Sequence, residues 1–401
     1  MYYRTTRMAS LSYAYSNPSN SSNHFLHRYT AIILILLFFF AVFRDYQRAK
    51  PDFPRRLRMR RIIENVQKYS EMISIEFIEN DPHFLSFAES LSLMQEPPFI
   101  IFFDMSNLNV TLNHFCNLKF MYGTLKRATA VAFEKEAELV FQRHYPHVPV
   151  ITIDFTAVKA AIPEDLENRK YIIYQLILLI RARVSTLLAA RNIDFWCMQQ
   201  DSIWTENFLS MDVEARFPQA NLIFDTVGND QIPIYQRMKG WICGSTFFVR
   251  GNKITVEFFK KVDLLMRSRQ SPDSAIMTYL CGAARFKCAK MPRWMVSSSN
   301  FFMGNRDITP IIIQVDHESN LTKMELFKRE KFVFRMDNGT CNYTALAFIR
   351  QAVNIALPEL ISTETEDKTS YLFRFLEFLN EVIGFDPYHN KYFLHVHEGI
   401  V

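Results

Sequence analysis

The segment Asn192-Ile-Asp-Phe-Trp-Cys-Met-Gln-Gln-Asp-Ser-Ile-Trp204 combines the pattern of a buried strand with a polar end that contains an acid. Its mainly apolar first part is typical of a buried strand, and it breaks at once into a polar run with an acid and a tryptophan. The pattern places Asp201 at the carboxyl end of that strand, where ligands bind in open α/β sheets. Asp201 could there meet a divalent cation that carries a nucleotide diphosphate. A turn-capping Asp201 and a core Trp204 are the structural alternatives.

Composition indicates a folded protein without affinity for nucleic acid. The 401-residue chain is 49% hydrophobic and 14% aromatic, and 37 phenylalanines exclude disorder for most of it. Its net charge of +5 is small for this length, and no nucleic-acid motif or basic stripe with interleaved aromatics accompanies it. We expect one domain with appendages.

From Pro98 onward, short apolar runs alternate with longer amphipathic runs. The predicted strands are Phe99–Phe103, Ala128–Phe133, Val148–Ile153, Ile193–Cys197, Asn221–Phe224, Ser245–Val249, Phe286–Ala289 and Ile311–Val315. The predicted helices are Leu108–Leu125, Glu134–Arg143, Arg169–Arg191, Lys253–Arg267 and Pro272–Ala284. This alternation predicts an α/β, Rossmann-like fold with a mostly parallel sheet and helices on both faces. No glycine-rich phosphate loop follows any strand, so phosphates must be held by other means.

The N-terminal region predicts a membrane anchor. The apolar run Tyr29–Phe43 is 15 residues long, short of the roughly 20 that a bilayer needs, but the flanking Arg28 and Arg44 can snorkel. A signal peptide and a buried core helix are the alternatives, although no small-residue cleavage site follows and the run lacks a polar face. The predicted divisions are 1–28 as cytoplasmic tail, 29–43 as signal-anchor transmembrane helix, 44–96 as stem, 97–339 as main domain and 340–401 as C-terminal helical appendage.

Two signals disagree about the side of the membrane that holds the domain. Eight basic residues within Arg44–Arg61, against three before the span, favour a cytosolic domain by the positive-inside rule. Acceptor sequons for glycosylation favour the lumen, and they lie at Asn109, Asn320, Asn338 and Asn342.

All six cysteines lie beyond the span, and none forms a Cys-x-x-Cys motif, so structural zinc is not expected. Cys281 with Cys288 is the favoured local disulfide, whereas Cys197 and Cys243, within strands, are expected to be buried and free.

Together with the helix before it, the stretch Arg181–Trp204 resembles the nucleotide-diphospho-sugar transferase family, which are glycosyltransferases of GT-A fold. The family signature is a helix with basic residues, then a strand that ends in Asp-x-Asp, two residues and Trp. Asp201 matches the second acid and Trp204 the tryptophan, whereas Gln199 stands in place of the first acid. Glutamine offers an amide oxygen but no charge, so we expect weaker metal affinity.

The resemblance covers about Ala128–Lys331 and implies further site residues. Asp316-His317, followed by Lys323, resembles the family's late histidine and lysine, in which the imidazole completes the metal site and the lysine meets phosphate. The implied metal ligands are Asp201, Gln199 and His317, and the expected divalent cation is manganese. The implied nucleotide-sugar contacts are Arg181, Trp204, Gly244 and Lys323.

Asp273 opens a predicted helix, and the resemblance implies that it lies near the acceptor as the catalytic residue. Helix capping explains Asp273 equally, and His317 could be a capping or surface residue. The segment around Gly244 could be an ordinary buried strand. Asp225 and Asp230 are weaker candidates.

The resemblance implies a glycosyltransferase that moves a sugar from a nucleotide-diphosphate donor, expected to be a UDP-sugar, to a glycan or protein acceptor. It further implies a single-pass type II membrane glycoprotein of the Golgi or endoplasmic reticulum with a lumenal catalytic domain. One alternative, which the uncharged Gln199 would allow, is a catalytically inactive member that binds glycan or a partner enzyme. The basic flank of the span alone favours a cytosol-facing scaffold.

Overall fold

The computed structural model describes most of the chain between residues 53 and 347. The described residues are 53–227, 241–282, 284–297, 301, 309–315, 321–345 and 347, with part of 29–39. The chain forms two compact units, Met1–Arg61 and Ile62–Val401.

The main sheet has seven strands in the order β3-β2-β1-β4-β7-β6-β8. Their bounds are Phe99–Phe103 for β1, Ala128–Ala132 for β2, Val150–Thr152 for β3, Phe195–Gln199 for β4, Leu222–Thr226 for β6, Ile242–Val249 for β7 and Cys288–Lys290 for β8. Strand β7 is antiparallel to β4 and β6, and the other four neighbouring pairs are parallel. The predicted mostly parallel α/β sheet is confirmed.

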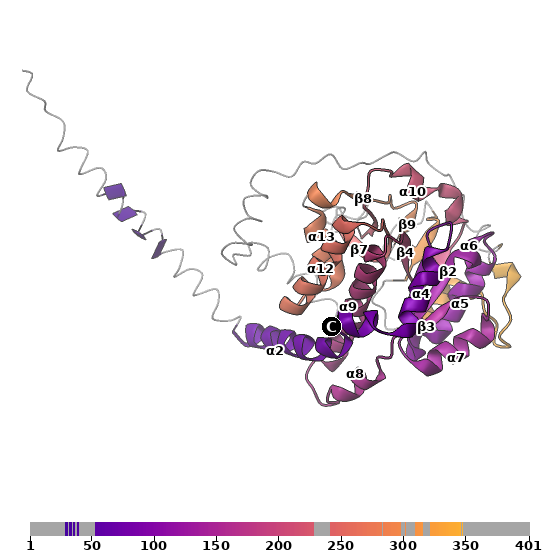
Figure 1. Ribbon diagram of the computed structural model, residues 1–401, viewed down its shortest axis with the longest axis horizontal. Helices are drawn as coiled ribbons and strands as arrows, with labels where there is room; N and C mark the ends of the chain where they lie inside the picture. Colours follow the sequence, from indigo (N-terminus) through magenta and orange to yellow (C-terminus); the bar gives the residue numbers. More distant parts are fainter. Residues whose placement is uncertain are drawn as a thin grey trace, which may run out of the picture. The chain divides into compact units, whose positions relative to one another are not determined.

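Helices cover both faces of this sheet. The longer ones are α2 Phe53–Ser70, α4 Pro82–Ser92, α5 Leu108–Lys119, α7 Lys135–His144, α9 Arg169–Ala190, α12 Lys253–Ser268, α13 Asp273–Cys281 and α15 Lys323–Glu330. The shorter ones are α3 Ile75–Glu79, α6 Thr124–Arg127, α8 Thr156–Ala161 and α10 Val213–Arg216. Figure 1 shows α12 and α13 beside α9.

Every residue of β1 is apolar, so helices must pack on both faces of the sheet to bury its side chains. Successive side chains of a strand point to opposite faces. Phe99, Ile101 and Phe103 therefore join one core with α5 and α7, while Ile100 and Phe102 join the other with α9 and α12. All five residues are buried, as expected for a strand of a helix-covered parallel sheet.

A second, three-stranded sheet contains the end of the motif. It has the order β5-β10-β9, with β5 Ser202–Trp204, β10 Ile312–Gln314 and β9 Val296–Ser297. Strand β10 is the predicted strand near Ile311–Val315, and it is antiparallel to β5. Strands of two or three residues, such as β9 and β5, are too short to show a period in the sequence.

Helix α5 holds this second sheet through polar side chains that are fully buried. The Asn117 amide donates to Trp204 O (2.9 Å) and accepts from Trp204 N (2.6 Å). Asn113 donates to Phe332 O (3.0 Å) and accepts from Phe334 N (2.7 Å). Each amide thus satisfies a backbone donor and a backbone acceptor that would otherwise be buried and unpaired.

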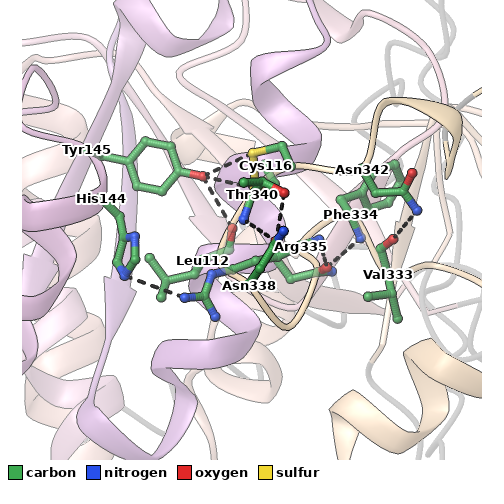
Figure 2. Close-up of a disulfide and its surroundings, with 12 residues drawn as sticks. Leu112, Cys116, His144, Tyr145, Val333, Phe334, Arg335, Asn338, Thr340 and Asn342 are labelled. Atoms are coloured by element: carbon green, nitrogen blue, oxygen red, sulfur yellow. Dashed lines mark hydrogen bonds between the residues drawn. A yellow bond between two sulfur atoms is a disulfide. The ribbon is translucent and has the colours of Figure 1, made fainter.

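Two disulfides add covalent links. Cys116 of α5 is bonded to Cys341, across a sequence separation of 225, and the expected pair Cys281–Cys288 is present. Figure 2 shows the first bond with Tyr145, whose hydroxyl donates to the Sγ of Cys116 at 3.3 Å. Cys197 and Cys243 are buried and take part in neither disulfide, as predicted.

The predicted stem, 44–96, is too long. The second compact unit begins at Ile62, and the core on the α9 face includes Val66, Ile78 and Phe84. This region therefore belongs to the domain. The predicted C-terminal helical appendage, 340–401, lies almost entirely outside the described residues.

In the part of the chain that the structure describes, one helix is long and apolar enough to cross a membrane, namely α9. It is mostly buried, which is the property of a core helix. The predicted anchor Tyr29–Phe43 is described only in part. Helical positions there are Tyr29, Thr30, Ile32, Ile33, Ile35, Leu36, Phe38 and Phe39. The signal anchor stays a prediction.

We predict that the disulfide Cys116–Cys341 contributes more stability than Cys281–Cys288. A cross-link limits the unfolded chain more when it closes a longer loop, so the separations of 225 and 7 correspond to about 5 and about 2 kcal/mol. Urea unfolding of the two double Cys→Ser variants measures both losses. Equal losses would show that loop closure is not what the long-range bond contributes.

Candidate active site

The sheet topology predicts where a ligand binds. From β1 the strand order runs through β2 and β3 on one side, whereas β4 lies on the other. The carboxyl ends of β1 and β4 thus border a topological switch point, at which parallel α/β sheets have a crevice. A pocket of about 210 Å³ lies there, and its lining includes Asp104, Asn107, Arg181, Gln199, Asp201 and Lys323.

Asp201 is held at the turn between β4 and β5 and is 1% exposed. The ammonium of Lys323, the first residue of α15, donates to its Oδ2. Oδ1 is buried and has no hydrogen-bond partner among the residues described. The Lys323 side chain is 44% exposed and the Asp201 side chain 1%, so a buried carboxylate is paired with a partly exposed lysine.

His114 of α5 forms a hydrogen bond with the backbone next to Asp201. Its Nδ1 lies 2.7 Å from Ser202 O, and a carbonyl can only accept, so Nδ1 carries the proton. Burial lowers the pKa of His114 to about 4, although the Ser202 carbonyl and the Asp201 charge oppose that shift. The imidazole is therefore neutral near pH 7. His114 and Ser202 are 88 positions apart in the sequence, so no local pattern indicates this contact.

Asp104 is a pocket residue that the sequence analysis missed. It follows β1 directly and accepts from the hydroxyl of Ser106 (2.7 Å) and the amide of Asn107 (2.9 Å). Burial by itself would raise the pKa of Asp104, but these bonds and the Lys159 ammonium at 3.6 Å lower it below the ordinary value. Asp104 could have been found by the rule that singled out Asp201, because both acids end a buried strand.

Arg181 and Asp273 form a buried ion pair. Arg181 Nε donates to Asp273 Oδ2 at 3.1 Å, a second guanidinium nitrogen bonds the same oxygen, and the residues are 7% and 4% exposed. Arg181 lines the pocket, whereas Asp273 is not among the lining residues. Asp273 thus positions the arginine, and the catalytic role predicted for it is not supported by its place.

Trp204 and Gly244 also differ from expectation. Trp204 is fully buried, with its ring 5.6 Å from that of Phe99 and 5.5 Å from that of Phe208, so it packs the core instead of contacting a nucleotide. Gly244 has φ +74°, and a Cβ would lie 2.7 Å from Met277. The left-handed backbone conformation accounts for the glycine, because the Met277 contact is made by the end of a flexible side chain that can move.

Asp225, a weaker candidate, has a backbone-binding role. Its carboxylate is buried and accepts from the backbone N–H groups of Gly244 (2.9 Å), Ser245 (3.3 Å) and Thr246 (3.1 Å). Asp230 lies outside the described residues, as do Asp316 and His317.

The described donors do not fit a divalent cation. The pocket lining has two carboxylates, but Oδ2 of Asp201 already binds an ammonium and Asp104 lies 3.6 Å from the ammonium of Lys159, while Gln199 offers an uncharged amide. Across the described ranges, no three His, Cys, Asp or Glu side chains gather to hold a metal. Hard cations such as Mg²⁺ and Mn²⁺ prefer several oxygen ligands, with carboxylates among them.

The pocket lies at the switch point where α/β proteins bind ligands, and its lining combines Asp104 and Asp201 from the ends of β1 and β4 with Arg181 of α9 and Lys323 of α15. Residues 123–327, just over half of the chain, match the model of the nucleotide-diphospho-sugar transferase family. The chain belongs to this family.

Solved structures of glycosyltransferases have a similar chain trace. Mouse xyloside xylosyltransferase 1 is 8% identical, with 56% of this chain and 99% of that chain covered and a TM-score of 0.40. Galactosyltransferase LgtC, solved with donor and acceptor sugar analogs, is 10% identical, with 65% of this chain and 98% of that chain covered and a TM-score of 0.39. Glycosyltransferase GlyE of Streptococcus pneumoniae is 9% identical over 64% of each chain, with a TM-score of 0.39. No curated protein sequence matches the chain.

We predict that Asp273→Asn destabilises the protein by about 3–5 kcal/mol, because it leaves the Arg181 guanidinium buried without its counter-charge. The matched control is Glu257→Gln, since Glu257 pairs with Arg285 at the surface, where loss of a pair costs at most about 1 kcal/mol. Urea unfolding followed by circular dichroism measures both. A stable, inactive Asp273→Asn variant would instead restore the catalytic assignment.

Proposed function

We propose that the chain transfers a sugar from a UDP-sugar to a hydroxyl of a glycan or protein. The observation that carries the proposal is the pocket at the switch point, where Lys323 presents an ammonium beside the buried Asp201. Membership of the nucleotide-diphospho-sugar transferase family supports a diphosphate donor. The choice of UDP as the nucleotide and of a glycan or protein as the acceptor rests on the sequence resemblance.

In the proposed reaction, the bond between the anomeric carbon and the diphosphate oxygen breaks, and its electron pair stays on that oxygen. The acceptor hydroxyl oxygen bonds the anomeric carbon, and its proton passes to the departing diphosphate or to water. In this proposal Lys323, whose side chain is partly exposed, binds the diphosphate through a charge-assisted hydrogen bond. Asp104, ionised at neutral pH, can accept a hydrogen bond from a hydroxyl or N–H group of the nucleoside.

A catalytically inactive binder is the second candidate, and the uncharged Gln199 at the pocket favours it. The two functions separate in one assay. An enzyme consumes UDP-sugar and releases UDP, whereas an inactive member forms no UDP from UDP-sugar. Release should be followed with and without glycan acceptors, because hydrolysis in the absence of acceptor also reveals an active site.

Lys323→Ala should weaken binding of UDP by about 1–3 kcal/mol, roughly 5-fold to 150-fold, because it removes a charge-assisted bond to phosphate. Lys328→Ala is the matched control, since Lys328 is an exposed lysine of the same helix that does not line the pocket. Isothermal titration with UDP measures both affinities. Equal affinities for the two folded variants would remove Lys323 from the proposed site.

We further propose that the domain is lumenal in the Golgi or endoplasmic reticulum, behind the predicted signal anchor. The sequons support this location to different degrees. Asn109 is exposed on α5, but its partner Thr111 is fully buried and donates to Asn107 O (3.0 Å) within helical backbone. Asn338 is exposed in a turn, and Asn320 lies outside the described residues.

Asn338 should therefore be glycosylated in the folded protein, whereas Asn109 should not. The expected result is that Asn338→Gln removes one step of the mobility shift produced by a glycosidase and that Asn109→Gln leaves the shift unchanged. Gel mobility of the protein from a secretory expression host measures this. An absence of any shift in the wild-type protein would contradict a lumenal domain.

A further inference from the structure

We propose that Lys323 takes the place of a divalent cation in this site, so that the chain binds its nucleotide diphosphate without metal. The inference rests on the proposed function and concerns how the same pocket neutralises the donor. It begins from the two carboxylates at the strand ends. Asp201 is bound by the ammonium of Lys323, and Asp104 lies 3.6 Å from that of Lys159.

Each described carboxylate of the pocket thus already has a cationic partner. A divalent cation would have to displace the Lys323 ammonium from Asp201, because the other oxygen, Oδ1, is buried. Gln199 would add an amide oxygen but no charge to offset that loss. Attraction for a second cation is therefore weak, whereas a diphosphate brings the negative charge that an ammonium needs.

Two features hold Lys323 in position, namely the N-terminal capping box of α15 and the ion pair with Asp201. Thr322 and Glu325 form a capping box, in which the Thr322 side chain accepts from Glu325 N and the Glu325 carboxylate accepts from Thr322 N. These bonds hold the first turn of α15, from which Lys323 extends. Asp201, on the other side, holds the ammonium at the end of β4.

The Lys323 side chain is partly exposed, so an anion from solvent can reach its ammonium. A lysine ammonium has three donors, so it can keep its bond to Asp201 and direct another at a phosphate oxygen. When the sugar departs, the electron pair of the broken bond stays on the diphosphate oxygen, and the ammonium stabilises that charge without transferring a proton. Lys323 would thereby supply the electrostatic stabilisation that a cation supplies elsewhere.

Titration of the full chain with UDP, in buffer with EDTA and in buffer with Mn²⁺, tests the inference. We expect the two dissociation constants to agree within about twofold for the wild-type protein and for the control Lys328→Ala. Lys323→Ala should bind at least about fivefold more weakly in EDTA, as expected for one lost charge-assisted bond. The double variant Gln199→Asp with Lys323→Ala supplies two acids and no competing ammonium, so it should recover affinity only with Mn²⁺.

The outcomes separate this inference from the proposed function. Wild-type binding that Mn²⁺ strengthens by tenfold or more would overturn the metal-free site and leave the nucleotide site intact. An absence of UDP binding in both buffers would overturn both. If the double variant fails to fold, the wild-type comparison decides by itself, because it needs no substitution.

Discussion

Two buried asparagines on α5 form the constraint on which the candidate site depends. Asn117 pairs with both backbone groups of Trp204, and Asn113 pairs with Phe332 O and Phe334 N. A buried backbone group without a partner costs about 1–3 kcal/mol, so these amides allow the edge of a small sheet and an irregular segment to be enclosed. The disulfide from Cys116 to Cys341 links the same helix to the same segment.

This arrangement fixes the backbone on each side of Asp201. Ser202 follows Asp201 in the chain, and its carbonyl oxygen accepts a hydrogen bond from His114. Val315 N donates to Asp201 O at 3.0 Å. The carboxylate is consequently held in a buried position at the end of β4, where it meets the lysine that begins α15. The site joins residues 122 positions apart in the sequence, and α5 supports their meeting although it contributes no lining residue.

Much of the fold could be predicted because its signals are local. The eight predicted strands are present within a few residues, since each apolar run was bounded by polar breaks. The site could be predicted only in part. Arg181, Gln199, Asp201 and Lys323 do line one pocket, but Trp204, Gly244 and Asp273 do not. Residue type does not tell whether a tryptophan or an aspartate after a strand points into the core, toward a buried arginine or into a crevice.

The class of fold, the strand edge that carries Asp201 and the family to which the chain belongs can all be recognised from the amino-acid sequence. These follow from periodicity and short motifs, which are properties of neighbouring residues. The tertiary structure alone decided which charges neutralise one another. Lys323 binds Asp201, Asp273 binds Arg181 and Cys116 binds Cys341, across separations of 122, 92 and 225 residues. Such pairs depend on how the helices pack on the sheet, and that packing cannot be predicted from a local sequence pattern.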